Sequence, residues 1–226
     1  MTATSVHRAA ETSAEVRRAM VDNQLRTNNI NNPTIVAALA TIPREPFVPA
    51  NSQAAAYIDR GLPLGGGRSL NPALTTARLI SELDATVDQS ILLIGAATGY
   101  AAAILASLGA RVTAVEESPE LLATAKAALQ GFDRITLVSA ALPSGAPETG
   151  PYDALIIDGA VEQLPESLLS QLVDGAVIVT GMIDQGVTRL GRAVHVAGTT
   201  TIHPLPFIDL ECVRLPGFAP PPRFTF

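Results

Sequence analysis

The chain has 226 residues, of which 47% are hydrophobic, with a mean hydropathy of +0.30 and a formal net charge of −6. This length and apolar content predict a single folded domain over residues 1–226, divided into an N-terminal part at 1–72 and an α/β core at 73–226. The acidic balance argues against broad electrostatic binding to nucleic acid, which depends on clustered lysine and arginine.

Other features of the composition exclude several kinds of site. The single cysteine, Cys212, cannot form an internal disulfide, and His7, His195 and His203 lack metal-ligand spacing, so no metal is predicted. Residues 1–11 lack the apolar core of a secretory signal, and no apolar run is long enough to cross a bilayer. We therefore expect a reduced, cytoplasmic protein without a membrane partner. The sequence specifies no oligomeric state.

The N-terminal part reads as two helices followed by a loop. Apolar spacing predicts a helix from about residue 13 to residue 25, and a second helix that begins at Asn32 and ends at Pro43. Residues 44–67 carry prolines at 46, 49 and 63 and a triple glycine at 65–67, so we expect a long ordered loop. Long loops in compact domains are often functional.

Strands and helices alternate in the remainder of the chain. Asn71 is a candidate N-cap of a helix over residues 73–83. Short apolar runs predict strands at 90–94, 111–116, 134–138, 153–157 and 175–180, with helices at 101–108, 120–129 and 165–172. This alternation favours an α/β fold with a doubly wound, mostly parallel sheet of about seven strands. Two tail strands, at 188–196 and 207–213, are expected to form an antiparallel hairpin at its edge.

A glycine-bracketed turn connects the first strand of this core to its helix. The turn residues are Gly95, Ala96, Ala97, Thr98 and Gly99. Such a turn lets a ligand approach the backbone and directs free N–H groups at it. The dinucleotide fingerprint would require glycines where Ala97 and Tyr100 stand, and no Lys-Ser/Thr pair follows as in a Walker motif. Two interpretations remain: the looser turn of S-adenosylmethionine enzymes and a purely structural turn.

The second strand of the core ends in an acid, Glu116, about twenty residues beyond the first glycine of the turn, where a carboxylate can accept both ribose hydroxyls of a bound nucleoside. Ser118 then predicts the N-cap of the next helix. The alternative interpretation is that Glu116 and Glu117 are solvated loop acids near a helix N-terminus.

Several stretches together resemble the protein-L-isoaspartate O-methyltransferase family, whose members have a Rossmann-like class I methyltransferase fold. The stretches lie at residues 20–25, 42–49, 56–59, 62–65, 93–100 and 151–157. The combination of Pro-Arg-Glu-x-Phe-Val-Pro with Leu-Pro-x-Gly is specific to that family, and the resemblance covers about residues 17–180. It implies S-adenosyl-L-methionine as methyl donor, S-adenosyl-L-homocysteine as product, and isoaspartyl residues of damaged proteins as acceptors. The cofactor residues that it implies are Gly95, Ala96, Ala97, Thr98, Gly99, Glu116, Glu117, Ala140 and Ala141.

The chain departs from the family pattern on both sides of this site. The family usually has an acid near the adenine, where this chain has Ala140 and Ala141, and a glycine in place of Ala97. After the glycine loop it usually reads Gln-Thr-Ile-Ser-x-Pro, and alignment on the proline places Leu70 at the hydroxyl position.

Arg68, Ser69 and Leu70 are therefore the candidate catalytic residues. A guanidinium can grip a carboxylate with two hydrogen bonds, so Arg68 is a candidate clamp for the acceptor. The alternative is an exposed loop arginine that pairs with Asp59 or with solvent.

The reaction implied by the resemblance needs little acid–base chemistry. An aspartyl-type carboxylate, with a pKa near 4, is already a nucleophile at neutral pH, so orientation and desolvation must supply the rate. Three hypotheses follow: methylation of isoaspartyl residues, methylation of another acceptor, and a non-catalytic cofactor-binding or regulatory role.

Overall fold

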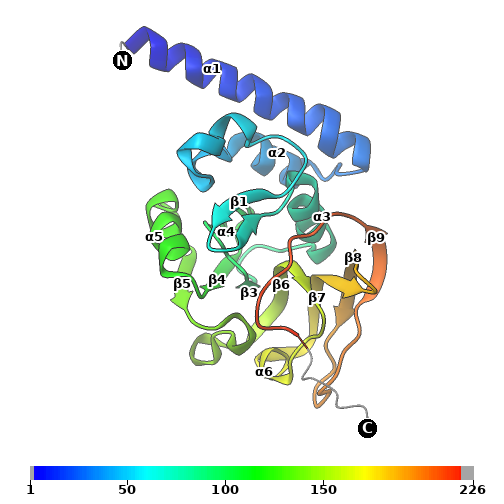
Figure 1. Ribbon diagram of the computed structural model, residues 1–226. Coiled ribbons are helices and arrows are strands. Elements are labelled where there is room, and N and C mark those ends of the chain that lie inside the picture. The colour runs from blue at the N-terminus through cyan, green and yellow to red at the C-terminus, as the bar shows by residue number, and fades with distance from the viewer. Residues whose placement is uncertain (1–2, 220–226) are drawn as a thin grey trace.

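The computed structural model describes residues 3–219, and it describes side chains for residues 12–219. The prediction about a secretory signal at residues 1–11, and the side chain of His7, lie outside the residues with described side chains. The chain begins with α1 (Ala3–Met20), which continues through a π-helical turn (Val21–Leu25) and a 3-10 turn (Arg26–Asn28) to α2 (Pro33–Thr41). Asn32 caps α2 as predicted, because its Oδ1 accepts the N–H groups of Thr34 and Ile35. Figure 1 shows α1 lying across the end of the molecule beside α2.

The prediction of a long loop at residues 44–67 was wrong. Its prolines begin short 3-10 helices at Glu45–Phe47 and Ala50–Ala55 instead of interrupting the structure. A hairpin follows, formed by β1 (Leu62–Gly65) and β2 (Arg68–Leu70). The triple glycine makes the hairpin turn, with φ angles of 98°, 56° and 76° that favour glycine.

A second, seven-stranded sheet forms the centre of the molecule. In chain order its strands are β3 (Ser90–Ile94), β4 (Arg111–Glu116), β5 (Ile135–Ser139), β6 (Tyr152–Val161), β7 (Leu172–Asp184), β8 (Val187–Val194) and β9 (Leu205–Asp209). The spatial order is β5-β4-β3-β6-β7-β8-β9. The first five are parallel, whereas β8 runs antiparallel to β7 and β9 antiparallel to β8. The predicted sheet and its antiparallel edge hairpin are therefore confirmed.

The helices of the core are α3 (Ala73–Leu83), α4 (Tyr100–Ser107), α5 (Pro119–Ala128) and α6 (Glu166–Leu169). Ser118 caps α5 as predicted, since its Oγ accepts the N–H of Leu121. Two boundary predictions were wrong. The helix expected at 165–172 is a single turn because β7 already begins at Leu172, and the last strand ends at Asp209 instead of continuing to residue 213.

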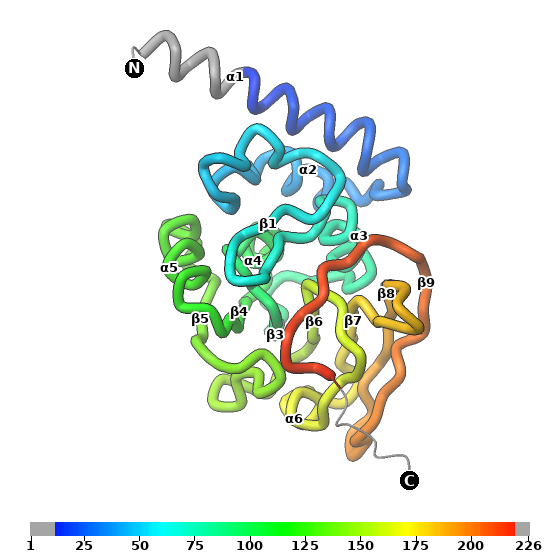
Figure 2. Tube along the Cα trace, in the orientation of Figure 1, coloured from blue at the N-terminus to red at the C-terminus, as the bar shows by residue number. Residues whose placement is uncertain are grey.

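Both faces of the central parallel strands β3, β4 and β6 are buried, whereas the edge strand β5 is partly exposed. Ile91 and Leu93 of β3 pack in one cluster with residues of α3, α4 and α5. Leu92 and Ile94 face the other way, into a cluster that includes residues of α6 and, from the C-terminal segment, Leu215 and Phe218. In Figure 2 that segment, in red, leaves β9 and crosses the molecule toward α6. No helix within residues 3–219 is long and apolar enough to span a bilayer.

The order of the strands reverses beside β3. From β3 the chain moves outward to β4 and β5 on one side, and then resumes with β6 on the other side of β3. Ligands of open α/β sheets bind at the carboxyl ends of the strands at such a reversal. The turn after β3 and the acid at the end of β4 both lie there.

Candidate active site

Glu116, at the end of β4, is completely buried and accepts four hydrogen bonds. Its Oε1 accepts from Arg68 Nη1 at 2.5 Å and from the N–H groups of Glu117 and Ser118 at 3.0 and 3.1 Å. Its Oε2 accepts from the N–H of Ala97 at 2.8 Å. A buried carboxylate requires such donors, because unpaired it would lose its hydration without compensation. The interpretation of Glu116 as a solvated loop acid was wrong, whereas Glu117 is exposed.

Arg68 is the counter-charge of Glu116. It lies in β2 and is only 6% exposed, so it pairs neither with Asp59 nor with solvent as the alternative interpretation expected. Its Nη2 is buried and has no hydrogen-bond partner. One nitrogen of the guanidinium therefore neutralises Glu116, and a second is buried without a hydrogen-bond partner.

The turn after β3 uses most of its own N–H groups. Those of Gly95 and Ala96 bond to the carbonyl of Val115, that of Gly99 bonds to Ala96, and that of Ala97 bonds to Glu116. The prediction that this turn offers free donors was wrong for these four residues. The turn therefore contributes its shape and its close approach to the strand ends. Ala97 adopts φ 49°, a left-handed conformation that alanine tolerates less well than glycine.

A buried arginine that the sequence analysis did not single out anchors this turn to the N-terminal part. Arg44 is 0% exposed, donates to the carbonyls of Ala56 and Asn71 at 2.8 Å each, and stacks 4.5 Å from the ring centroid of Tyr100. Phe47 meets the same ring edge-on at 5.5 Å. Thr98 Oγ1 donates to the carbonyl of Phe47 at 2.6 Å. The bulky ring of Tyr100, which argues against a dinucleotide turn, therefore packs against Arg44 and Phe47 of the N-terminal part.

A second acid, Asp158, is buried near the end of β6. Its Oδ1 accepts from Asn71 Nδ2 at 2.8 Å and from Thr76 Oγ1 at 3.0 Å. Burial raises the pKa of the Asp158 carboxyl, and these two hydrogen bonds lower it in part. Asn71 was predicted to cap α3, but its side chain does not do so. Its Oδ1 instead accepts the N–H of Val213.

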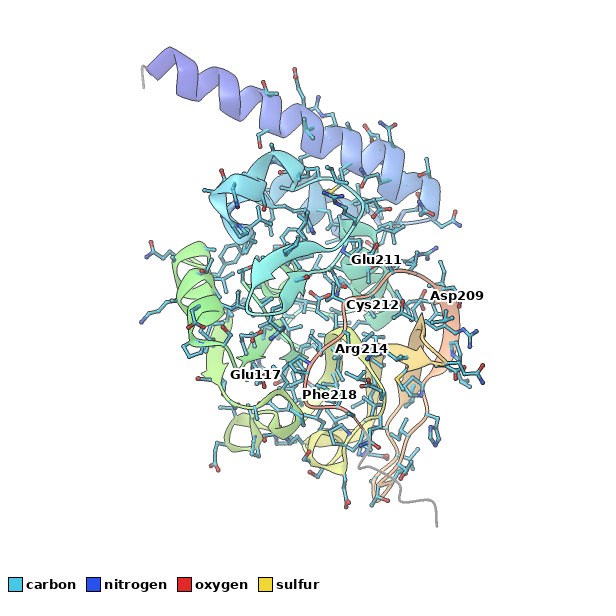
Figure 3. The ribbon with its side chains drawn as sticks, in the orientation of Figure 1. Glu117, Asp209, Glu211, Cys212, Arg214 and Phe218 are labelled. Atoms are coloured by element: carbon cyan, nitrogen blue, oxygen red, sulfur yellow. The ribbon has the colours of Figure 1, made fainter. Side chains whose placement is uncertain are left out.

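The C-terminal strap, defined as residues 211–218, passes over the carboxyl end of β6. The N–H of Ala160 donates to the carbonyl of Val213 at 2.7 Å, and the N–H of Leu215 donates to the carbonyl of Ala160 at 3.0 Å. Leu215 is 2% exposed and covers both Gly95 and Gly159. Figure 3 shows the run of the strap through Glu211, Cys212, Arg214 and Phe218.

The remaining predicted site residues lie around this centre. Arg68 and Leu70 are buried on one side of β2, where Leu70 belongs to the apolar core, and Ser69 between them is partly exposed. Ala140 follows β5, and its N–H lies 3.4 Å from the carbonyl of Glu116, with Ala141 exposed beside it. Two residues that the sequence analysis left outside the site, His195 and Cys212, are buried as well. His195 Nδ1 lies 3.0 Å from the carbonyl oxygen of Val173. Burial raises the pKa of the Cys212 thiol.

A seven-stranded sheet with this order, a glycine-bracketed turn after β3 and an acid at the end of β4 define the class I methyltransferase fold. Solved structures agree. One protein-L-isoaspartate O-methyltransferase superposes with a TM-score of 0.76 at 20% identity, covering 89% of this chain and 66% of its own. A second such structure, from Plasmodium falciparum in complex with S-adenosyl-L-homocysteine, has a TM-score of 0.75 at 14% identity, covering 88% and 97%.

Sequence comparison defines the family. The model of the protein-L-isoaspartate(D-aspartate) O-methyltransferase family matches residues 15–203. The enzyme named protein-L-isoaspartate O-methyltransferase in Herpetosiphon aurantiacus is 37% identical over 199 residues, covering 86% of this chain and 89% of its own. That of Gloeobacter violaceus is 34% identical, covering 84% and 96%. This chain therefore belongs to the protein-L-isoaspartate(D-aspartate) O-methyltransferase family, a family of enzymes that use S-adenosylmethionine.

The residues at the strand ends fit this methyl donor in chemistry. Glu116 has two lone pairs on each oxygen, and Oε2 uses only one of them, so it can accept a ribose hydroxyl. The turn from Gly95 to Gly99 brings the backbone close. The space next to Gly95 and Gly159, however, is filled by Leu215.

A double-mutant cycle tests the buried ion pair. Arg68→Met leaves the Glu116 charge with backbone donors only, and we expect it to lower the free energy of unfolding by about 3–5 kcal/mol. Adding Glu116→Gln removes that charge, so the double variant should lose about 1–3 kcal/mol less than the sum of the single changes. Urea unfolding of the four proteins measures this coupling.

The exposed pair of Arg134 and Asp88, also 2.5 Å apart, serves as the matched control cycle. Its coupling should be far smaller because water screens both partners. Equal coupling in the two cycles would contradict the assignment of Arg68 and Glu116 as a buried charge pair.

The second prediction concerns the pH dependence of stability. Because the folded-state pKa of Asp158 is raised, the folded state binds more protons than the unfolded state above about pH 4, the pKa of a free aspartate. Wild-type stability relative to Asp158→Asn should therefore fall as pH rises from 4 through the folded pKa. The substituted amide retains an oxygen that can accept from Asn71 and Thr76. Urea unfolding of both proteins at several pH values measures the difference.

Asp88→Asn supplies a control of opposite sign. Arg134 lowers the pKa of the Asp88 carboxyl, so the wild-type advantage over this variant should grow as pH rises. A stability difference for Asp158→Asn that is flat, or that rises with pH, would be incompatible with a carboxyl destabilised by burial.

Proposed function

We propose that this chain transfers the methyl group of S-adenosylmethionine to the free carboxyl of isoaspartyl residues in damaged proteins. The observation that carries the proposal is the buried acid at the end of β4 beside the β3–α4 turn, in a chain that belongs to this family. The lone buried cysteine is consistent with work in a reducing cytoplasm. We also propose that residues 1–226 act as one domain.

The cofactor side of the proposed site consists of Glu116 and the turn residues 95–99. Glu116 would accept the ribose hydroxyls, and Ala97 would keep the carboxylate oriented through its N–H. Glu117, Ala140 and Ala141 surround the nucleoside in this proposal. Ala140 and Ala141 have no polar side-chain atom, so their recognition of a base depends on backbone groups.

The acceptor side of the proposed site centres on Arg68. Its buried, unpartnered Nη2 is the available donor for an isoaspartyl carboxylate. Ser69 lies next to it in β2. Leu70, at the position where the family has a hydroxyl, packs in the core and offers no hydrogen bond, so we assign it a structural role. We assign the orientation of the acceptor carboxylate to Arg68.

No general base is required for the proposed reaction. The carboxylate is already ionised at neutral pH, and the methyl group moves by displacement on a sulfonium. The contribution of this chain is to hold the acceptor oxygen in line and to exclude water, and effective molarities from such positioning are worth about 7–11 kcal/mol.

A methyl-transfer assay tests the proposal directly. A hexapeptide with one isoaspartyl residue should accept a radiolabelled methyl group from S-adenosylmethionine, and the same peptide with a normal aspartyl linkage should not. Transfer to neither peptide, with S-adenosylhomocysteine binding intact, would favour the alternative of another acceptor, which the substitution at Leu70 supports. Absence of both binding and transfer would favour the non-catalytic alternative.

The role of Arg68 has its own test. Arg68→Lys keeps the positive charge beside Glu116 but loses the second nitrogen of the fork, so kcat/KM for the isoaspartyl peptide should fall at least about tenfold, equivalent to ~1.4 kcal/mol. Steady-state kinetics at varied peptide concentration measures it. Arg111→Lys, on the exposed opposite end of β4, is the matched control. Equal kcat/KM for Arg68→Lys and wild type would remove the arginine from acceptor binding.

A further inference from the structure

We propose that the outer edge of β5 is a docking site for an extended segment of a partner protein, in which apolar and acidic side chains alternate. The segment would add a strand to the border of the seven-stranded sheet. The proposal does not depend on methyl transfer, because residues 135–138 lie outside the proposed active site.

The border of the sheet at β5 is open. β5 is the terminal strand of the sheet and, among the residues that the structure describes, pairs only with β4. Figure 1 shows β5 at the border of the sheet, beside α5. A strand border of this kind presents a row of unpaired N–H and C=O groups, and an extended peptide can pair with them as an additional strand.

The hydrogen bonds to β4 show which backbone groups of β5 face outward. The N–H of Val112 donates to the carbonyl of Arg134 at 2.9 Å, and the N–H of Ala140 donates to a carbonyl of β4 at 3.4 Å. Even-numbered residues along β5 therefore bond to β4. Because the bonding direction alternates along a strand, the N–H and C=O groups of Ile135 and Leu137 point away from the sheet.

One face of this edge is apolar. Ile135 and Leu137 are half-buried there, and together with α5 they line a groove of about 320 Å³. The other lining residues are Lys126, Leu129 and Phe132. In an added strand, the residues opposite Ile135 and Leu137 point to the same face of the sheet. Apolar side chains at these positions would therefore enter the groove.

The other face of the edge is polar, with a second groove of about 480 Å³. Its polar lining consists of Arg111, Thr113, Asp133, Arg134, Thr136 and Thr149. Arg134 forms an ion pair with Asp88, whereas the exposed Arg111 has no ion pair within residues 12–219. Arg111 is therefore the cation of this groove whose charge a partner can neutralise.

This free cation selects an acidic partner. Arg111 belongs to β4, and because neighbouring strands lie about 4.8 Å apart, an added strand would lie about 10 Å from β4. An arginine and a glutamate side chain together span this distance, so a glutamate opposite Thr136 would form a charge-assisted hydrogen bond with Arg111. A second copy of this chain fits less well. Antiparallel pairing of two β5 edges would bring the Arg111 and Arg134 side chains of both copies to the same face.

The experiment is a fluorescence anisotropy titration of the full-length protein into a labelled peptide that repeats Val-Glu. We expect saturable binding by wild type, and at least about tenfold weaker binding by Arg111→Glu, because that substitution places like charges against each other. Arg60→Glu, at an exposed arginine outside both grooves, has the same change of charge and should bind as wild type does. A peptide that repeats Val-Lys should not bind.

Amide hydrogen exchange locates the bound peptide. Saturation of wild type with the Val-Glu peptide should slow exchange at the amides of Ile135 and Leu137 at least about tenfold, because both gain a hydrogen-bond acceptor. The amides of Thr136 and Val138 already bond to β4 and should exchange as before.

Saturable binding together with this alternating protection supports the proposal. Absence of saturable binding at concentrations of about 1 mM overturns it, as does binding that leaves Ile135 and Leu137 unprotected. Protection of these two amides in the free protein that disappears on dilution would identify a second copy as the occupant, and would overturn the proposal as well. None of these outcomes bears on methyl transfer, so the proposed function is tested separately by its own assay.

Discussion

The negative charge buried at the end of β4 is the constraint on which the rest of the site depends. Glu116 is completely excluded from water, so the chain must supply it with a cation and with oriented N–H groups. The N–H of Ala97 fixes the turn after β3 against β4, and the N–H groups of Glu117 and Ser118 fix the start of α5. The ion pair between Arg68 and Glu116 holds the β1–β2 hairpin against the same carboxylate. A single carboxylate therefore holds together three separate segments of the chain: the β1–β2 hairpin, the turn after β3 and the β4–α5 connection.

The sequence predicted the sheet well because its signals are local. Apolar runs separated by capped helices, such as α5 behind Ser118, determine strands and helices without knowledge of the tertiary fold. The failures have tertiary causes. Residues 44–67 fold into 3-10 turns and a hairpin because Arg44, completely buried, hydrogen-bonds the carbonyls of Ala56 and Asn71. No local sequence pattern predicts that this arginine is buried.

The site could be predicted only in part. The turn and Glu116 follow from spacing along one βαβ unit, and both lie together in the structure as expected. The partner of Arg68 could not be found, because the two residues are 48 positions apart and belong to different sheets. Asn71 looked like a helix cap, yet it bonds to Asp158 and to the strap. The one signal that could have revealed the strap is Gly159, a glycine inside a buried strand, which often marks a close backbone approach.

Membership in the family and the geometry at the strand ends together support one central proposal: the cofactor site lies between the β3–α4 turn and Glu116. The most direct measurement is a crystal structure of the chain grown with S-adenosylhomocysteine. We expect a ribose hydroxyl hydrogen-bonded to Glu116 and the cofactor against the turn from Gly95 to Gly99. A structure in which S-adenosylhomocysteine binds elsewhere, without a contact to Glu116 or to this turn, would contradict the proposal.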